Sequence, residues 1–229
     1  MSTNKSSLTL RVLARLLSYP DAELRTHLGE LQAALHSERA LDAARQAELD
    51  ALMRSLTTRD PIEVEADYVQ LFDRGRSTSL HLFEHVHGDS RDRGPAMIDL
   101  AQTYEKAGLY LAEGELPDYL PVVLEFVSTQ PAKEAKAFLG EMTHILQAIF
   151  SALLKRESPY ASVLGALLEI AGERAQAVKV AEEPPLDESW EEPVAFGGCS
   201  TEGQAKPGQP QPIRIVRNEA RRPNAAQGV

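Results

Sequence analysis

The sequence predicts an all-α protein: a single compact helical bundle of about eight or nine helices, followed by a disordered C-terminal tail. Two observations support this fold class. Apolar residues recur at steps of three and four through most of residues 1–180, which is the spacing of one helix face. Only Ile213–Val216 alternates as a strand does, and one short strand without a partner does not make a sheet.

The first four helices are defined by apolar stripes in the N-terminal third of the chain. Their stripe residues, in order, are Leu10, Leu13, Leu16 and Leu17; Leu24, Leu28, Leu31 and Leu35; Leu41, Leu49, Leu52, Met53 and Leu56; and Ile62, Val69 and Phe72. Tyr19-Pro20 ends the first helix, because proline cannot continue a helix. Asp60-Pro61-Ile62-Glu63 starts the fourth, with Asp as N-cap and Pro at the first helical position.

Four further helices are expected before the tail. Their ranges are about 77–87, 95–108, 131–153 and 159–178. Gly88 supplies a left-handed residue after the first of them, and Pro117 and Pro121 bracket a connector before the third. The inward positions of the last two helices are Phe138, Met142, Ile145, Ile149 and Leu153, and Val163, Leu167, Ile170 and Val178.

Composition separates a folded body from a tail. Residues 1–180 form the predicted helical domain, and residues 181–229 form a mostly disordered tail that holds seven of the 14 prolines and separates its acidic from its basic residues. The single Cys excludes an internal disulfide framework and favours a reducing compartment. No apolar run approaches the roughly 20 residues of a bilayer span. We therefore expect a cytoplasmic protein without direct membrane insertion.

The charge balance limits the partners. With 34 acidic and 24 Lys or Arg residues, the formal net charge is −10. A duplex nucleic acid needs a basic face, so we expect no nucleic-acid partner. The same charge is compatible with a basic client.

Most catalytic motifs are absent, and His81-Leu-Phe-Glu-His85 is the exception because it matches the HxxEH pattern of some zinc proteases. On a helix, His81, Glu84 and His85 would share one face, with two His holding zinc and Glu acting on the bound water. A zinc-dependent hydrolase is therefore the alternative function. It needs a third ligand, for which the chain offers only unsupported candidates, and we favour an ion-paired surface. His87 falls on the other face, as a buried histidine or a helix C-terminal cap.

Arg74 and Arg76 precede the expected helix start at Ser77. Two guanidinium groups beside free backbone N–H groups could bind the anionic part of a nucleotide or cofactor. The alternative is that they pair with Asp67, Asp73 or Glu84 and hold the loop. We favour this structural interpretation, because acidic residues are abundant nearby.

Several segments together resemble the respiratory nitrate reductase delta-subunit family of assembly chaperones, the NarJ family. The resemblance runs from about Leu10 to Phe196. Its segments are Leu16–Asp21, Leu56–Pro61, Phe72–Arg76, Ser79-Leu80, Leu82–Gly88, Ser90–Gly94, Glu115–Pro121 and, in the tail, Trp190–Phe196. The run between Phe72 and Gly94 is the most specific of them.

The resemblance implies a TorD-like helical chaperone that is not an enzyme. Such a protein binds the apo catalytic subunit of nitrate reductase through that subunit's N-terminal segment. It keeps the subunit competent for insertion of molybdenum cofactor and iron–sulfur clusters before membrane attachment. The resemblance also suggests molybdenum-cofactor delivery proteins as further partners, and no permanently bound cofactor.

The resemblance also suggests site residues. The wider group has a Glu…Pro-Asp-His hinge linked to client binding, and Glu115, Pro117 and Asp118 match it, with Tyr119 in place of His. A tyrosine can still donate a hydrogen bond at that position. The candidate client-binding or family-motif residues are Phe72, Asp73, Arg74, Arg76, His81, Glu84, His85, His87, Glu115, Pro117, Asp118 and Tyr119.

Overall fold

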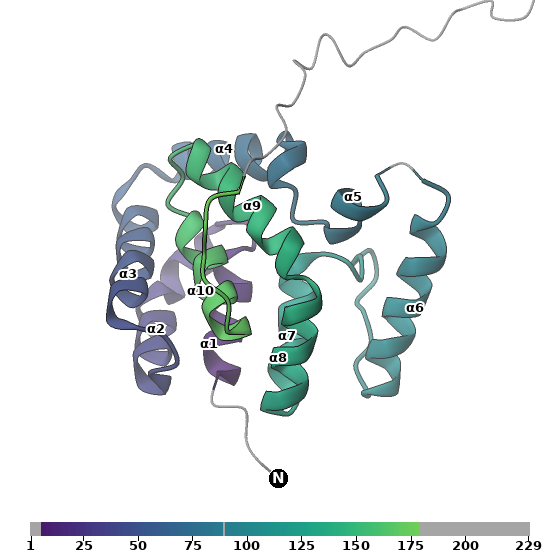
Figure 1. The fold of residues 1–229 in the computed structure, drawn as a ribbon. Coiled ribbons are helices and arrows are strands. Elements are labelled where there is room, and N and C mark those ends of the chain that lie inside the picture. Colours follow the sequence, from purple (N-terminus) through teal and green to yellow (C-terminus); the bar gives the residue numbers. More distant parts are fainter. Residues whose placement is uncertain (1–5, 89, 179–229) are drawn as a thin grey trace, which may run out of the picture. The chain divides into compact units, whose positions relative to one another are not determined.

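Ten α-helices make up most of residues 6–88 and 90–178, the part of the chain that the computed structural model describes (Figure 1). Their bounds are α1 Ser7–Leu16, α2 Ala22–Glu38, α3 Ala43–Thr58, α4 Pro61–Tyr68, α5 Leu82–Val86, α6 Arg93–Lys106, α7 Leu120–Thr129, α8 Ala132–Glu141, α9 Thr143–Lys155 and α10 Ala161–Ala171. A π-helix, Val69–Asp73, and a short 3-10 helix, Arg76–Thr78, follow α4. These described residues contain no strand, so the all-α prediction is confirmed.

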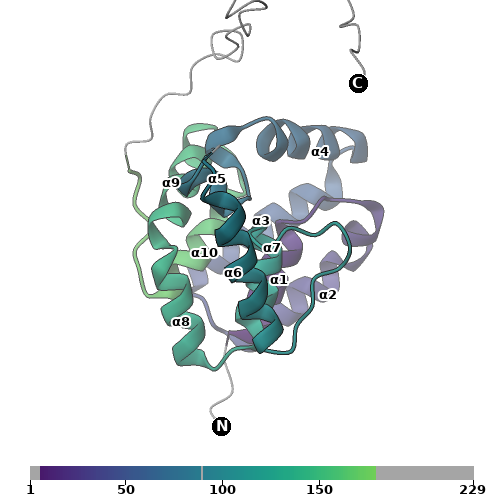
Figure 2. The same ribbon diagram turned by 90° about the vertical axis from the view of Figure 1, so that its right-hand side faces the viewer.

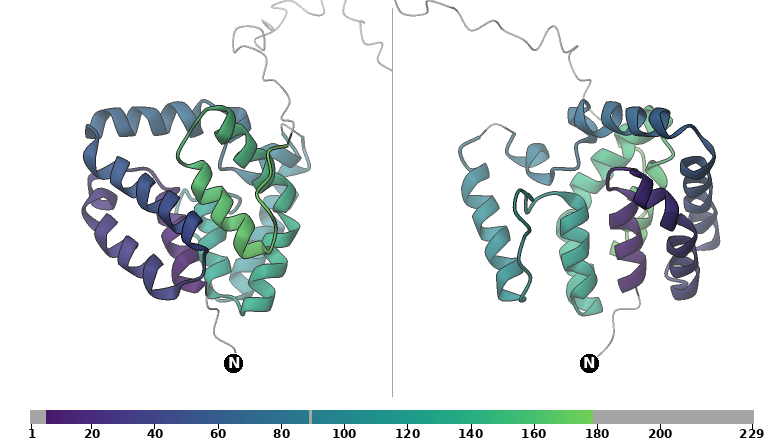
Figure 3. Two further views of the ribbon diagram at one scale, coloured as in Figure 1. Left: turned by 60° about the vertical axis from the view of Figure 1, so that its left-hand side comes forward. Right: turned by 180° about the vertical axis from the view of Figure 1, so that it is seen from behind.

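The core lies where α1 and α10 meet their neighbours. Helix α1 packs on α2 and α7, while α10 packs on α9, α8 and α3 (Figure 3). The predicted stripe of α1 is confirmed, because Leu10, Leu13, Leu16 and Leu17 are all fully buried. Burial of apolar side chains such as these is the main driving force for folding.

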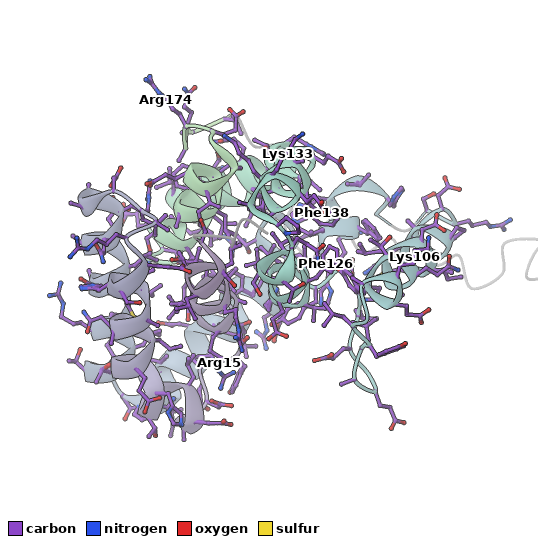
Figure 4. The ribbon with its side chains drawn as sticks, turned by 90° about the horizontal axis from the view of Figure 1, so that it is seen from below. Arg15, Lys106, Phe126, Lys133, Phe138 and Arg174 are labelled. Atoms are coloured by element: carbon purple, nitrogen blue, oxygen red, sulfur yellow. The ribbon has the colours of Figure 1, made fainter. Side chains whose placement is uncertain are left out.

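Helix α6 forms an outer layer over α7, as Figures 1 and 2 both show. Tyr104 is its only buried side chain, and the Tyr104 ring lies 4.8 Å from that of Phe126 on α7. Phe126 in turn packs on Phe138 of α8 at 5.4 Å. Figure 4 shows these two rings between α7 and α8. One row of aromatic rings therefore links α6, α7 and α8.

The predicted start of α4 is confirmed. The Asp60 side chain accepts hydrogen bonds from the backbone N–H groups of Ile62 and Glu63, and Pro61 is the first helical residue. Ile62, one of the apolar residues expected on this helix, does not belong to its buried face, because its side chain is 77% exposed. The buried face of α4 is instead formed by Val64 and Tyr68.

The expected long helix over 131–153 is two helices. Helices α8 and α9 meet at Met142 and are bent by 65° relative to each other. No helix was expected between Pro121 and Pro131, yet α7 occupies that range and is buried along most of its length. The sequence therefore predicts too few helices by missing one and fusing two.

The last helix ends earlier than predicted. Gly172 follows α10 with φ +85°, a left-handed conformation that ends the helix. Val178 therefore lies beyond the helix and is 45% exposed rather than inward-facing. The predicted tail, residues 181–229 including Trp190–Phe196, lies outside the described residues, so its disorder stays a prediction.

Within the part of the chain that the structure describes, no single helix combines the length and apolar character of a bilayer span. Helices α8 and α9 reach that composition only when counted together across their bend.

Candidate functional site

Two family-motif segments far apart in the sequence lie side by side. His81 and Tyr119 form an isolated antiparallel bridge. The Leu120 N–H donates to the Leu80 carbonyl at 2.8 Å, and the Leu82 N–H donates to the Asp118 carbonyl at 3.0 Å. The most specific motif and the predicted hinge therefore form one local structure.

Asp118 is the buried centre of this structure, with a fully buried side chain. Its carboxylate accepts a hydrogen bond from the Phe83 N–H at 3.1 Å. His81 Nδ1 lies 3.4 Å from one carboxylate oxygen, and Arg93 Nη2 lies 3.8 Å from the other. The hydrogen bond to Asp118 raises the pKa of His81, although partial burial acts in the opposite direction.

Tyr119 links the hinge to the N-terminal helices. Its ring lies 5.3 Å from the His81 ring, and its hydroxyl oxygen lies 3.3 Å from that of Tyr68. The Tyr68 hydroxyl also donates to the Leu17 carbonyl at 2.7 Å. Burial raises the pKa of both tyrosines, so both phenols stay neutral near pH 7. The tyrosine that replaces the family histidine thus serves as a neutral hydrogen-bonding group.

Two adjoining hollows open at this junction. The first, which we call the aromatic hollow, has a volume of about 500 Å³ and is lined by Tyr19, Tyr68, Phe72, Asp73, Leu80, His81, Gly114, Glu115, Leu116 and Tyr119. The second, the loop hollow, has about 360 Å³ and is lined by Phe72, Asp73, Arg74, Gly75, Arg76, Ser79, His81 and Glu84. They share Phe72, Asp73 and His81. Most of the candidate residues therefore converge on one surface.

Four candidates do not line these hollows. His85 Nε2 lies 2.8 Å from the Ser79 carbonyl, and His87 occupies the C-cap of α5 with its ring 5.5 Å from that of Phe83. Pro117 and Asp118 are buried, and the Tyr104 hydroxyl donates to the Pro117 carbonyl at 2.8 Å. These residues hold the walls of the site in place.

The expectation that His81, Glu84 and His85 share one helix face is wrong. His81 is the extended N-cap residue before α5, with φ −87° and ψ 104°. Glu84 lies 3.6 Å from Arg93, so the three side chains turn to different partners. Across residues 6–88 and 90–178, no three His, Cys, Asp or Glu side chains gather as a metal-binding group. No observation therefore favours the zinc hydrolase.

The alternative interpretation, an anion site at Ser77, also loses its basis. The residues there form a 3-10 turn rather than the start of an α-helix, and the N–H groups of Thr78 and Ser79 are used within that turn. Asp67, a predicted partner of the loop arginines, pairs with Arg59 at 2.7 Å. The turn needs Gly75, since a Cβ there would come within 2.6 Å of the Leu71 carbonyl oxygen.

Several residues of the site were not among the candidates. Tyr19, Tyr68 and Leu116 line the aromatic hollow, while Arg93 and Tyr104 anchor α6 beside it. Tyr19, Arg93 and Leu116 lie inside the segments that carry the family resemblance, so the resemblance could have identified them as site residues. Tyr68 and Tyr104 lie outside those segments, and the sequence shows only that they occupy helical positions.

The chain matches the family model described as the nitrate reductase delta subunit over residues 20–165, more than half of its length. The chain belongs to this family. It is 43% identical over 197 residues to the nitrate reductase molybdenum cofactor assembly chaperone NarJ of Escherichia coli (strain K12), covering 86% of this chain and 84% of that relative.

Two further members of the delta-subunit family are similar over most of their length. The probable nitrate reductase molybdenum cofactor assembly chaperone NarW of the same strain is 37% identical, with 80% of each chain covered. The probable nitrate reductase molybdenum cofactor assembly chaperone NarJ of Bacillus subtilis (strain 168) is 32% identical. The match covers 73% of this chain and 90% of that relative. These relatives are named as assembly chaperones and not as enzymes, which confirms the prediction of a non-catalytic protein.

A solved structure supports the fold. A putative redox enzyme maturation protein from Archaeoglobus fulgidus matches with a TM-score of 0.51 at 21% identity, covering 73% of this chain and 94% of that chain. At this identity the likeness concerns the fold alone. It confirms the predicted helical architecture.

Proposed function

We propose that this protein binds the apo catalytic subunit of a respiratory nitrate reductase through that subunit's N-terminal segment. It keeps the subunit competent for insertion of molybdenum cofactor and iron–sulfur clusters before membrane attachment. The names of its relatives support the role in cofactor assembly. The observation that carries the proposal is the aromatic hollow, because the family-motif residues converge on it.

The chemistry of the aromatic hollow suits an amphipathic client segment. Its walls are mostly aromatic and aliphatic, including Tyr68, Phe72 and Leu80, whereas the carboxylates of Asp73 and Glu115 lie among its exposed lining residues. An apolar side chain of the client would fill the hollow while a neighbouring Lys or Arg meets the carboxylates. Charge of this kind raises the association rate more than the affinity.

The proposal extends to location and partners. The single Cys supports a cytoplasmic setting, in which the protein works on its client without ligating a cluster itself. It binds no cofactor permanently, so the molybdenum cofactor reaches the client from delivery proteins that dock on the chaperone–client complex.

Calorimetry on matched variants tests the proposal. The ligand is a synthetic peptide of the first 20 or so residues of the nitrate reductase catalytic subunit from the same genome. Leu116, in the aromatic hollow, and Leu154, on α9 and outside both hollows, are each 43% exposed. We expect Leu116→Glu to weaken peptide binding at least tenfold, because a carboxylate covered by the apolar face of the client would lose its hydration without gaining a partner. Leu154→Glu should bind as the wild type does.

A pull-down decides the broader function. We expect the wild-type chain, expressed in cells grown anaerobically on nitrate, to co-purify with the apo catalytic subunit. If wild-type protein neither binds the peptide nor retains the apo subunit, the proposed function is wrong. If the wild type binds but both leucine variants bind equally well, the client sits elsewhere on the chaperone.

A further inference from the structure

The outward face of α4 carries an apolar stripe that the fold does not bury. Ile62, Ala66 and Val69 follow one another at steps of four and three, which places them on one helix face. Ile62 is 77% exposed, Ala66 is exposed, and Val69 is half-buried. An isolated exposed apolar residue needs no explanation, but a stripe at helical spacing indicates a contact surface.

This stripe borders a third hollow, which we call the α4 hollow. It has a volume of about 420 Å³ and is lined by Tyr19, Ile62, Glu65, Ala66, Val69, Gln70 and Arg74. Tyr19 also lines the aromatic hollow, and Arg74 also lines the loop hollow. The α4 hollow therefore adjoins the candidate site, and Tyr19 stands between it and the aromatic hollow as a ridge.

Charge around the stripe is mostly negative, although Arg74 also lines the α4 hollow. Residues 60–73 carry five carboxylates, those of Asp60, Glu63, Glu65, Asp67 and Asp73, and no Lys or Arg. Two of these have a guanidinium partner within hydrogen-bond distance, since Arg25 lies 3.1 Å from Glu65 and Arg59 lies 2.7 Å from Asp67. The segment remains acidic after these pairs are counted. An apolar stripe flanked by carboxylates complements a helix that is apolar on one face and basic beside it.

Contacts with two neighbouring side chains hold the Tyr19 ring in place. The Tyr19 ring packs edge-on against Tyr68 at 5.6 Å, and its hydroxyl donates to Glu65 at 3.0 Å. The ring is thus fixed from both sides while it stays 42% exposed. A partner helix lying across this ridge would place apolar side chains on either side of it, since residues three and four apart are neighbours on one face.

We propose that the outward face of α4 is the second half of the client-binding surface. Its occupant is one amphipathic helix of the client, with Lys or Arg beside its apolar face, that spans from the aromatic hollow across Tyr19 to Ile62. This inference rests on the proposed function, because it assigns the same client segment a longer contact. It predicts that a client segment too short to pass Tyr19 binds weakly.

The test compares two exposed isoleucines in the full chain. Ile62→Glu alters the α4 stripe, and Ile98→Glu alters a residue on α6 that is 59% exposed and outside the three hollows. Calorimetry with the catalytic-subunit peptide described above should show at least tenfold weaker binding for Ile62→Glu, which corresponds to about 1.4 kcal/mol. Ile98→Glu should bind within twofold of the wild type. Because both side chains are exposed, thermal unfolding of the two variants should match the wild type.

The outcomes separate this inference from the function on which it rests. Wild-type affinity for Ile62→Glu, while Leu116→Glu binds poorly, would overturn the inference and leave the proposed function standing. Unchanged peptide affinity together with a loss of self-association in light scattering would assign the α4 face to a second copy of this chain, and would also overturn it. Failure of the wild type to bind peptide or apo subunit would reject both proposals.

Discussion

Replacing Asp118 with Asn tests whether the buried carboxylate holds the two motif segments together. Asparagine has nearly the same shape and keeps an oxygen that can accept from the Phe83 N–H. It loses the negative charge that faces His81 at 3.4 Å and Arg93 at 3.8 Å. The substitution therefore removes an electrostatic contribution with little change in packing.

The expected magnitude follows from these contacts. A hydrogen bond to a charged group contributes about 1.5–3 kcal/mol, against about 0.5–1.5 kcal/mol for a neutral one. Arg93 and His81 retain about a third of their side-chain exposure, 28% and 33%, so water compensates part of their loss. We expect a loss of about 2–3 kcal/mol in the free energy of unfolding, which lowers the melting temperature of a body this size by about 4–12 °C.

Thermal unfolding followed by circular dichroism measures this loss. The matched control is Asp99→Asn, which removes an exposed carboxylate on α6 and should change stability by less than about 0.5 kcal/mol. If Asp118→Asn melts with the wild type and with the control, the carboxylate does not hold the junction and the reasoning fails.

Three further perturbations probe the same region. Tyr104→Phe removes a buried hydroxyl that donates at 2.8 Å, and should cost about 0.5–1.5 kcal/mol in urea unfolding; an unchanged midpoint would contradict the role of that bond. Gly75→Ala should destabilise by about 1–3 kcal/mol because its Cβ has no room, whereas Gly94→Ala, with nothing within 4 Å, should not. The pKa of His81 is raised in the folded state, so its pairing with Asp118 stabilises below the ordinary pKa of about 6.5 and is lost as pH rises through the folded-state pKa. His81→Asn should therefore cost more stability at pH 6 than at pH 9, and an equal cost at both would contradict the pairing.

Helix periodicity predicted the elements whose apolar faces are narrow and whose ends carry caps. Helices α2 and α3 are of this kind, with the carboxylates of Asp21 and Asp42 as their N-caps. Helix α7 was not predicted, because it is apolar on nearly all sides and therefore lacks the polar face that makes a helix visible in a sequence. The break at Met142 was also invisible, since the apolar spacing continues through it.

The site was predictable in part. The family resemblance singled out Phe72, Asp73, His81 and Glu115, and the fold brings them to one hollow. The error lay in reading His81 as helical. Its extended backbone is imposed by pairing with residues 118–120, a long-range contact that no local pattern contains.

Partners at long range also explain the residues that were missed. Tyr68 and Tyr104 look like ordinary core positions in the sequence. Their hydroxyls matter because tertiary packing places them opposite the Leu17 and Pro117 carbonyls.

The way α6 is attached has a consequence for how the body opens. This helix has one buried side chain, and its anchors near either end, Arg93 and Tyr104, contact the consecutive residues Asp118 and Pro117. Its release therefore requires far less free energy than global unfolding, and it is a natural unit of sub-global opening. Pro117 and Asp118 lie in the chain between Leu116 and Tyr119, which line the aromatic hollow, so detachment of α6 would also loosen that wall. The outer helix α6 thus sets how firmly the aromatic hollow keeps its shape.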